Sequence, residues 1–514
     1  MSKTIIIIGA GLAGLSAALQ AAENGCNVKL VSFFPSERAQ SVMAEGGINA
    51  ALNTKDENDS PEEHFTDTIK AACGLADPNA VWGMTQAAPE LVHWLLKLGV
   101  KFNMSGYDDV DLRNFGGQKK KRTAFAQSDT GKQIMTAMID AVRRKEASGM
   151  VERFSHHSFL TLRLCGNICC GCVIRDEYSQ ETVELPGDAV IVATGGMHGL
   201  FGNTTGSLSN TGEVTAELFR LGVPLANGEM IQYHPTTVKC GGKRMLISEA
   251  ARGEGGRLFA MKDGKQWYFM EEKYPELGNL MPRDITAREI WKVSHESEVF
   301  LDMTEISDEI ISNKLSGLAD DCMTYLHKDI RKEPVSVLPG IHYFMGGILV
   351  DEQHRTPIQN LYAAGECCAQ YHGANRLGGN SLLGALYGGR VAAKSACEQA
   401  DVVDLSCATQ IDFPPASQIS EIKQLNKVMQ ETMGVVRNEN TLLNGIQTVQ
   451  ALTGNLPLLG MAVLKSALAR KESRGAHWRE DYPKSNDDDY LKTTVARFDG
   501  KQIQISFVPV PERR

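Results

Sequence analysis

The sequence has no long uninterrupted apolar run and no excess of positive charge. The uncharged stretch 4–22 is broken by glycines, a serine and a glutamine, which favours a strand entering a helix over a membrane span or a signal peptide. We therefore expect no membrane anchor within the chain. The 53 Lys and Arg against 62 Asp and Glu give a net charge of −9, which argues against binding nucleic acid or an anionic membrane.

The 12 cysteines lack the spacing of a secreted disulfide framework, so a reducing cytoplasm is the expected compartment. Four of them cluster around a Gly-Asn dipeptide, at Cys165, Cys169, Cys170 and Cys172. The flanking residues are typical of two strands around a turn, which predicts a structural hairpin. A metal or iron–sulfur centre is the alternative, but no second cysteine pair accompanies the cluster, so no metal site is predicted.

A strand, a glycine turn and a helix open the chain. Residues 4–8 are typical of a parallel strand buried on both faces, residues 15–23 favour a helix, and between them lies Gly9-Ala10-Gly11-Leu12-Ala13-Gly14. Gly9 permits the tight turn, Gly11 lets the backbone approach a pyrophosphate, and Gly14 lets helix and strand pack closely. Free N–H groups at the helix start face the anion. This pattern predicts a dinucleotide site.

Two later segments repeat a buried strand followed by a turn. They are 188–196, which contains Thr194 and Gly195, and 360–366, which ends in Glu366. Because these strand ends are far apart in a chain of 514 residues, we expect a nucleotide-binding domain interrupted by an inserted domain that covers the reactive ring of the cofactor. The second strand, 28–32, ends in Ser32 instead of the acidic residue that accepts the ribose hydroxyl of NAD, which favours FAD.

Four regions between residues 230 and 385 combine arginine, histidine and glycine. They are 232–236, 248–256, 282–284, and the paired segments 342–347 and 372–382. Each has a plain structural explanation, such as an Arg252–Glu254 ion pair or a core position for His342. Together they place three arginines and two histidines on irregular segments, where sites tend to lie. Guanidinium groups and imidazoles suit a dicarboxylate, because each carboxylate accepts paired charged hydrogen bonds.

These motifs resemble the flavoprotein subunit of succinate dehydrogenase and fumarate reductase. The similarity runs from AEGGINAAL (44–52) through QYHPT, ARGEGG, PRD, HYFMGG and HGANRLGGNSLLGAL to ESRGAHWREDYP (472–483), in the family's order and over nearly the whole chain. It implies an α/β fold: a Rossmann-like FAD-binding domain (1–230 and 341–412) interrupted by an α+β capping domain (231–340). A helical domain (413–475) and a C-terminal segment (476–514) would follow.

The resemblance also implies roles for single residues. The two substrate carboxylates would be held by His234, Ser248, His342 and Arg376. Arg283 would deliver a proton to one alkene carbon while flavin N5 delivers hydride to the other, and Glu249 and Arg252 would relay protons to Arg283. An arginine can act as an acid where a second guanidinium destabilises its charge and a carboxylate re-protonates it. The further cofactor contacts implied are Gln40, Ser41, Glu45, Gly46, Gly47, Glu213, Ser381 and Leu382.

The chain departs from the family at the flavin attachment point. Respiratory members link FAD covalently through the histidine of R-S-H-T-V-A-A, whereas here the aligned residue is Gln40, and an amide cannot form that link. We therefore expect non-covalent FAD. A covalent flavin has the higher potential, which helps succinate oxidation, so its absence favours fumarate reduction.

Non-covalent FAD also occurs in the related L-aspartate oxidases. Their E-G-G-H segment supplies a glutamate that faces the substrate amine, and here that residue is Phe115, which can pack on a methylene but cannot pair with an ammonium. A simple dicarboxylate is therefore favoured, with L-aspartate oxidase as the alternative. An inactive flavin-binding structural subunit is an alternative of another class, and the joint presence of Arg283, His234, His342 and Arg376 argues against it.

Two smaller departures put local flavin contacts in question. The family's T-G-D-G reads Thr211-Gly212-Glu213-Val214, and its A-A-D-[KR]-T-G reads 126–131 with Ser128 and Asp129 and no basic residue. Neither haem nor FMN domain nor a cysteine pattern for a cluster is evident in the sequence. Electrons are therefore expected to pass to or from a separate partner, by resemblance an iron–sulfur subunit. The expected location is cytoplasmic, and peripheral at the inner face of the cell membrane where partner subunits anchor it.

Overall fold

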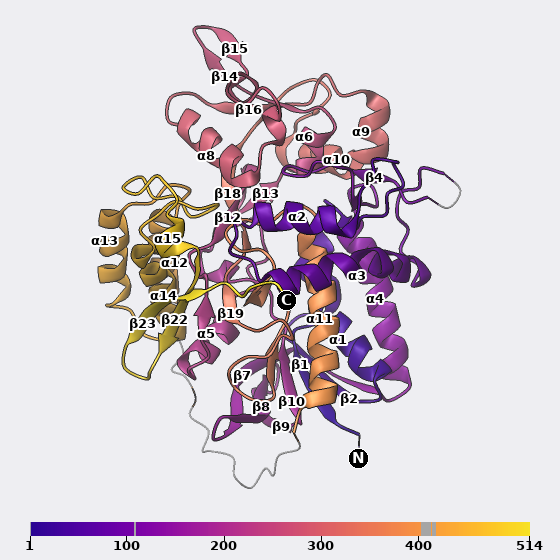
Figure 1. Cartoon of the computed structure of the whole chain (residues 1–514), viewed down its shortest axis with the longest axis vertical. Coiled ribbons are helices and arrows are strands. Elements are labelled where there is room, and N and C mark those ends of the chain that lie inside the picture. The colour runs from indigo at the N-terminus through magenta and orange to yellow at the C-terminus, as the bar shows by residue number, and fades with distance from the viewer. Residues whose placement is uncertain (1, 107–108, 402–412, 414–417) are drawn as a thin grey trace.

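A five-stranded parallel sheet forms the centre of the nucleotide-binding part (Figure 1). The computed structural model describes residues 2–106, 109–401, 413 and 418–514. The strand order is β20-β10-β1-β2-β6. The bounds are Leu361–Ala363 for β20, Ala189–Val192 for β10, Thr4–Ile8 for β1, Asn27–Ser32 for β2 and Val151–Ser155 for β6. Because the strands are parallel, the predicted strand ends after Ile8, Ser32 and Val192 meet at one edge of the sheet.

Helix α1 (Leu12–Glu23) follows the glycine turn and packs along α11 (Asn380–Gln399), although they lie far apart in sequence (Figure 1). The Ser16 hydroxyl donates to the Leu386 carbonyl at 2.6 Å. A Cβ on Gly389 would lie 2.3 Å from the Ala13 carbonyl oxygen, so the two backbones touch. Further helices of this part are α2 (Pro61–Ala71), α3 (Pro78–Lys97) and α4 (Thr130–Ala147). A small sheet contains β3 (Ile48–Asn49), β5 (Thr123–Ala124) and β4 (Leu112–Arg113).

The cysteine cluster lies in a hairpin, as predicted. Strands β7 (His157–Cys165) and β8 (Ile168–Asp176) pair antiparallel around the Gly166-Asn167 turn, and β9 (Thr182–Pro186) pairs with β8. Cys169 and Cys172 are fully buried and pack with the apolar residues of this sheet. Within the described residues, no group of three or more His, Cys, Asp or Glu side chains is arranged to hold a metal ion.

A second α+β unit lies above the nucleotide-binding part in Figure 1. Its first sheet contains β12 (Ile231–Cys240), β13 (Lys243–Leu246) and β18 (Leu338–Phe344). Its second contains β14 (Arg257–Lys262), β15 (Lys265–Trp267), β16 (Val299–Asp302) and β17 (Val335–Ser336). Its helices are α6 (Glu249–Gly253), α7 (Phe269–Lys273), α8 (Arg283–Val293), α9 (Asp308–Lys314) and α10 (Ser316–Asp321). The interrupted fold is thus as expected, although the boundary predicted at residue 340 falls inside β18.

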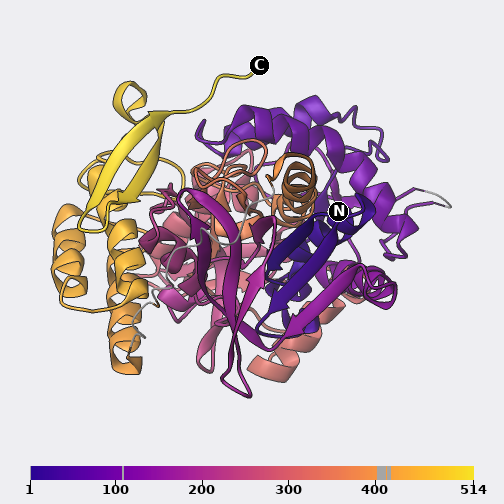
Figure 2. The ribbon, with the colours of Figure 1, turned by 90° about the horizontal axis from the view of Figure 1, so that it is seen from below.

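The C-terminal part gathers on one side of the molecule, at the left of Figures 1 and 2. Helices α12 (Ile419–Thr432), α13 (Glu439–Val449) and α14 (Asn455–Ala469) form the predicted helical unit, whose expected start at residue 413 borders residues outside the described ones. The C-terminal segment, for which the sequence predicted no strands, contains α15 (Asp487–Tyr490), β22 (Lys492–Phe498) and β23 (Ile503–Pro509).

The last two strands extend a sheet of the nucleotide-binding part. Strand β22 pairs antiparallel with β11 (Leu225–Ala226) in a sheet ordered β21-β19-β11-β22-β23, where β19 is Gly347–Leu349 and β21 is Cys368–Ala369. Helix α5 (Glu213–Arg220) precedes β11 and packs on α14. Among the helices of the described residues, none is both long and apolar enough to cross a membrane.

Gly14→Ala tests the close approach of α1 to the turn. A Cβ at residue 14 would lie 1.9 Å from the Gly9 carbonyl oxygen, so the variant must shift α1 at a cost of about 1–3 kcal/mol or more. We expect a lower unfolding temperature and less flavin in the purified protein, measured by thermal unfolding and by absorbance. Gly242→Ala is the matched control, because a Cβ there meets no atom within 4 Å. Equal flavin content in the two variants would contradict the predicted role of Gly14.

Candidate active site

Strands β12 and β18 bring two histidines together. Residues Gln232 and His234 alternate along β12 and so lie on one face, while His342 lies on β18, and the His234 and His342 ring centres are 5.1 Å apart. The pairing of the strands shifts register after Gln232 and again after His234, where Pro235 follows. The His342 Nδ1 lies 2.8 Å from the Thr205 hydroxyl, which fixes the ring.

Arg283 and Glu249 form the central ion pair of the site. Both residues open helices, Glu249 after the N-cap Ser248 and Arg283 after Pro282. The Arg283 Nε and Nη2 lie 2.7 and 2.6 Å from Glu249 Oε2, a forked contact between buried side chains. A third donor, Nη1, contacts Gln232 Oε1 at 3.1 Å. The other Glu249 oxygen accepts from the Gly116 amide at 2.9 Å.

Two further arginines lie beside this pair and keep free donors. Arg252 Nη2 lies 3.6 Å from Glu249 Oε1, and Arg376 lies over the Tyr343 ring at 4.4 Å. Within the described part of the chain, Arg252 Nε and Nη2 and Arg376 Nε are buried without a hydrogen-bond partner. Because unpaired buried donors are costly, these groups are suited to an anionic ligand. The sequence also allowed an ion pair between Arg252 and Glu254. In the described part of the chain that pair is not formed, and Glu254 instead pairs with Lys314 at 3.0 Å.

The electrostatics of the cluster favour an anionic ligand. Three guanidinium groups (Arg252, Arg283 and Arg376) lie around the Glu249 carboxylate, and the charge of Glu366 also acts on Arg376, which leaves the buried cluster with a net positive charge. Burial and the charge of Arg283 lower the pKa of Arg376 to about 9. Burial raises the pKa of the Glu249 carboxyl, but the charges of Arg283 and Arg252 outweigh it and hold that pKa below its ordinary value.

The two histidines are neutral in this field. Burial is the largest cause that lowers the pKa of His234, followed by the charge of Arg283. Burial and Arg283 likewise hold the pKa of His342 well below its ordinary value. Each ring therefore offers one N–H donor rather than a charge. Ser248, buried close by, adds a hydroxyl.

Phe115 lies where the substrate residues meet the predicted cofactor residues. Its side chain is buried, and the next residue supplies the amide that binds Glu249. A Cβ on Gly46 would lie 3.0 Å from the Phe115 ring, and one on Gly378 would lie 3.0 Å from the Phe115 Cβ. The phenyl ring therefore forms an apolar wall between the Glu45–Gly47 segment and the loop of Arg376.

The glycine turn at the carboxyl edge of the sheet has the shape that a pyrophosphate requires. A Cβ on Gly9, whose φ is +111°, would lie 2.3 Å from the Ala193 carbonyl oxygen, directly before Thr194 and Gly195. Helix α1 begins after Gly11 with no acidic residue in its first turn, and beyond the Leu12 amide, which donates to Ser41, that turn offers N–H groups to an anion. Ala10 is buried within the turn.

Buried polar atoms around this turn fit a bound dinucleotide. Among the described residues, the Ser32 hydroxyl at the end of β2 is buried without a hydrogen-bond partner, which suits a ribose hydroxyl. The Ser41 hydroxyl accepts from the Leu12 amide at 3.2 Å, and Gln40 Oε1 accepts from the Ser207 amide at 2.6 Å. The residues present therefore fit FAD.

Several predicted cofactor residues converge on the same region. Removal from water and the charge of Asp321 raise the pKa of Glu45 to about 8. Glu366 Oε1 accepts from the Phe344 amide at 3.1 Å and lies 3.6 Å from His198 Nε2. Ser381 and Leu382 occupy the first turn of α11, directly after the Arg376 loop. Glu213 differs, because its side chain is exposed and its charged neighbours are Arg175 and Glu177 on and beside β8.

Sequence reasoning gave no role to two residues that hold the site together, Gln232 and Arg113. Gln232 donates to Asn375 Oδ1 at 2.9 Å and to the Arg376 carbonyl at 2.8 Å while it accepts from Arg283. Its place two residues before His234 on one strand was the available signal. Buried Arg113 donates to the Gly46 carbonyl at 2.9 Å and to the Glu45 carbonyl at 3.0 Å. Nothing in the sequence around Arg113 indicated this contact.

Comparison with known proteins agrees with this geometry. A family model described as an FAD binding domain matches residues 4–382, and one described as the fumarate reductase flavoprotein C-terminus matches residues 452–513. With the fold and the site, these matches define an FAD-dependent oxidoreductase.

Individual relatives show which family of FAD-dependent oxidoreductases the chain belongs to. The succinate dehydrogenase flavoprotein subunit of Bacillus subtilis is 38% identical over 100% of this chain and 98% of its own length. The 8-methylmenaquinol:fumarate reductase flavoprotein subunit of Wolinella succinogenes is 32% identical over 100% of this chain and 92% of its own length. A solved structure of the E. coli quinol fumarate reductase FrdA matches with a TM-score of 0.90 and 27% identity over 99% of this chain and 97% of that one. The chain belongs to the succinate dehydrogenase and fumarate reductase flavoprotein subunit family.

The buried imidazole of His64 should make the stability of the folded chain sensitive to acid. His64 Nε2 lies 2.9 Å from Asn380 Oδ1, and burial together with the Arg122 charge lowers the pKa of His64 to about 3. The unfolded chain binds this proton near pH 6.5 and the folded chain does not, so stability is lost as pH falls from about 6.5 to about 3. Between pH 7 and pH 5, we expect the free energy of unfolding of His64→Gln to fall by about 2 kcal/mol less than that of the natural protein.

Urea unfolding at the two pH values measures this difference. His295→Gln removes an exposed histidine and is the control, with the same pH response as the natural protein. An unchanged response in His64→Gln would show that this imidazole is protonated in the folded state.

Proposed function

We propose that this flavoprotein interconverts fumarate and succinate, chiefly as a fumarate reductase, on a non-covalently bound FAD. The observation that carries the proposal is the buried cluster of three arginines around Glu249, whose net positive charge and unpaired guanidinium donors suit the carboxylates of a small dicarboxylate. The glycine turn, Ser32, Ser41 and the first turn of α11 would hold the cofactor.

The two carboxylates of the substrate would be bound by groups from three segments. Arg283 and Arg376 both lie near His342, since the charges of both act on it. Arg283 and Arg252 lie near His234, since their charges act on it, whereas the Ser248 hydroxyl accepts from the Ala250 amide and contacts the Glu45 carboxyl. Neutral imidazole N–H groups bind carboxylate without adding charge, so the arginines supply the attraction and the histidines supply orientation. Phe115 would pack against the carbon chain and exclude water.

Bound FAD supplies hydride exchange with the substrate carbon. Arg283 would hold the proton that the adjacent carbon receives. Its Nε and one Nη2 donor are directed at Glu249 and Nη1 contacts Gln232, and its remaining donor capacity is available to the substrate. Fixed contacts on both sides of the guanidinium orient it before reaction, which lowers the entropic cost of proton transfer.

Glu249 would return the proton to Arg283. While Arg283 is charged, its field keeps the Glu249 pKa low and the carboxylate ionised. Once Arg283 gives up its proton, that stabilisation disappears and Glu249 becomes a better proton acceptor from Arg252 and a better donor to Arg283. Arg252 therefore completes a path through side chains that are already in contact.

Arg283→Lys tests the proton-donor role. A lysine keeps the charge but cannot reproduce the forked contact with Glu249, so we expect turnover to fall by at least about 100-fold with flavin still bound. Arg288→Lys is the matched control on the same helix, where the guanidinium stacks on Trp478 at 4.0 Å. Activity of Arg283→Lys within tenfold of the natural protein would refute the role.

The substrate is tested by comparing two reactions. We expect rapid oxidation of reduced viologen by fumarate and no peroxide release from L-aspartate, because the Phe115 ring offers no charge to a substrate amine. Turnover of L-aspartate with peroxide release, and none with fumarate, would instead establish an L-aspartate oxidase. Absence of both activities in flavin-loaded protein would support an inactive structural subunit.

The mode of flavin binding is tested by acid precipitation. Gln40 occupies the position of the linking histidine, and its side-chain oxygen already accepts from the Ser207 amide. We expect a colourless pellet and a yellow supernatant. A yellow pellet that resists washing would mean a covalent link to another residue.

The electron partner is the remaining part of the proposal. The relatives are named as flavoprotein subunits, and a subunit exchanges electrons within a larger enzyme. We propose an iron–sulfur subunit as the partner, and association with a membrane through that complex.

A further inference from the structure

Two cysteines from opposite ends of the nucleotide-binding part meet in the structure. Cys26 lies between α1 and β2, and Cys397 lies in the last turn of α11. Their sulfur atoms are 2.9 Å apart, although 371 residues separate them in the sequence. Both are free thiols. The pair is outside the substrate and cofactor residues described above.

We infer that Cys26 and Cys397 are an oxidisable dithiol, which a peroxide converts to a disulfide that joins α1 to α11. A disulfide requires sulfur atoms about 2.05 Å apart, so the existing contact must shorten by less than about 1 Å. The two helices already pack along each other, so no large backbone movement is needed.

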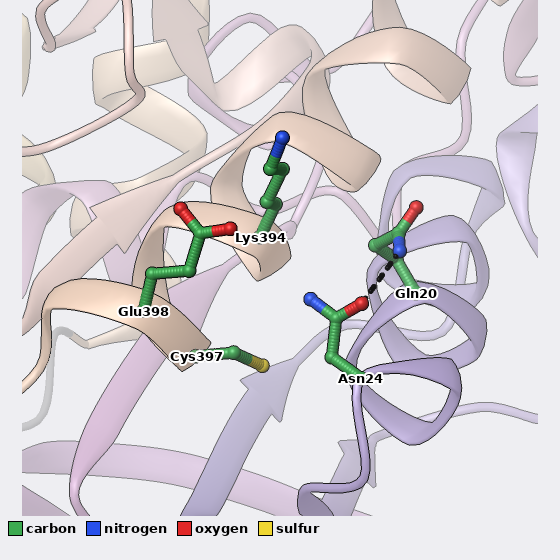
Figure 3. Close-up of a pocket in the computed structure, with 5 residues that line it drawn as sticks. All are labelled: Gln20, Asn24, Lys394, Cys397 and Glu398. Carbon is green, nitrogen blue, oxygen red and sulfur yellow. Dashed lines mark hydrogen bonds between the residues drawn. The ribbon is translucent and has the colours of Figure 1, made fainter.

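The pair is open to a small oxidant from one side. Cys397 is half-buried and lines a surface depression with Gln20, Asn24, Lys394 and Glu398, as Figure 3 shows. Cys26 is 5% exposed and lies behind it. A peroxide therefore reaches Cys397 first, and Cys26 is the thiol placed to resolve the product.

The chemistry balances with one peroxide per disulfide. The Cys397 thiolate attacks a peroxide oxygen, the O–O bond breaks, and a sulfenic acid and one water form. The Cys26 thiol then attacks that sulfur, the S–O bond breaks, and a second water leaves. Each sulfur gives up one electron and one proton, and the peroxide takes both electrons.

The surroundings make this reaction slow and specific. Burial and the neighbouring Cys26 raise the pKa of Cys397 to about 12, while the Lys3 charge and Asn24 oppose this shift. The Lys3 ammonium also donates to the Cys397 carbonyl at 2.7 Å. Lys394 and Glu398, of opposite charge, lie on the same helix as Cys397. The thiol is protonated at neutral pH, so the disulfide accumulates under sustained peroxide and not within seconds.

The link would tie together two helices whose other ends serve the site. Helix α1 begins at the glycine turn, and α11 begins directly after the Arg376 loop. Because both cysteines are at the far ends of these helices, oxidation should raise the unfolding temperature and leave basal turnover unchanged.

The experiment uses the flavin-loaded full chain and hydrogen peroxide. After oxidation, free thiols are alkylated under denaturing conditions and peptides are analysed by mass spectrometry. We expect a new linked pair containing Cys26 and Cys397 that is absent before oxidation, two hydrogens lighter than the separate peptides and released by dithiothreitol. We also expect a higher unfolding temperature that dithiothreitol reverses.

Three variants separate the outcomes. Cys397→Ser and Cys26→Ala should each lose the linked peptide and the temperature shift, whereas Cys240→Ser, which removes a half-buried cysteine on β12, should keep both. Oxidation of Cys397 to sulfinic acid with Cys26 unmodified would overturn the proposal. So would a link confined to the adjacent Cys367 and Cys368, or complete alkylation of Cys26 and Cys397 after oxidation.

Discussion

A single buried carboxylate, Glu249, makes the substrate site possible. Three guanidinium groups gathered without it would repel one another and lose their hydration, a cost of several kcal/mol for each ion. Glu249 contacts Arg283 through one oxygen and approaches Arg252 with the other, and the Gly116 amide holds that second oxygen in place. The compensation is partial, and this is what leaves the cluster with a net positive charge.

Gln232 connects the arginine cluster to two separate parts of the molecule. Its amide accepts from Arg283 of α8 and donates to the loop of Arg376, so it joins two units that lie at different levels in Figure 1. The same loop is fixed from below, where Asn49 and Gln118 both donate to the Gly378 carbonyl, at 2.7 and 2.9 Å. The arginine that would grip substrate is thus positioned by neutral amides, which direct hydrogen bonds without altering the charge of the site.

Local patterns in the sequence were sufficient to predict the parts that depend on neighbouring residues. The strand at 4–8, the turn through Gly14 and the hairpin at Gly166-Asn167 follow from apolar runs and glycine placement. The motifs of the site also directed attention to Arg283, Glu249 and His342, which the structure places at the starts of α8 and α6 and on β18. Their mutual contacts could only be expected through the family resemblance, since spacing in a sequence does not fix distances between domains.

The failures share a cause. No secondary structure was predicted for residues 476–514. Residues 503–507 of β23 alternate apolar and polar side chains, but β22 does not, and its partner β11 lies more than 250 residues earlier. The cofactor contact of Glu213 stays a prediction, because residue 213 begins helix α5 and a helix start alone does not tell which way a side chain faces. The contact between Cys26 and Cys397 depends on the packing of α1 on α11, which no local pattern encodes.

The place of β22 in its sheet has a consequence for synthesis. Strand β11 is paired on one side by β19 and on the other by β22, so one edge of β11 has no strand beside it until residues 492–498 have left the ribosome. Domains of a growing chain generally fold from the N-terminus, and here the nucleotide-binding part contains a strand made more than 250 residues after β11. Until that strand is made, a nascent chain has a bare β11 edge that a chaperone or another chain can occupy first.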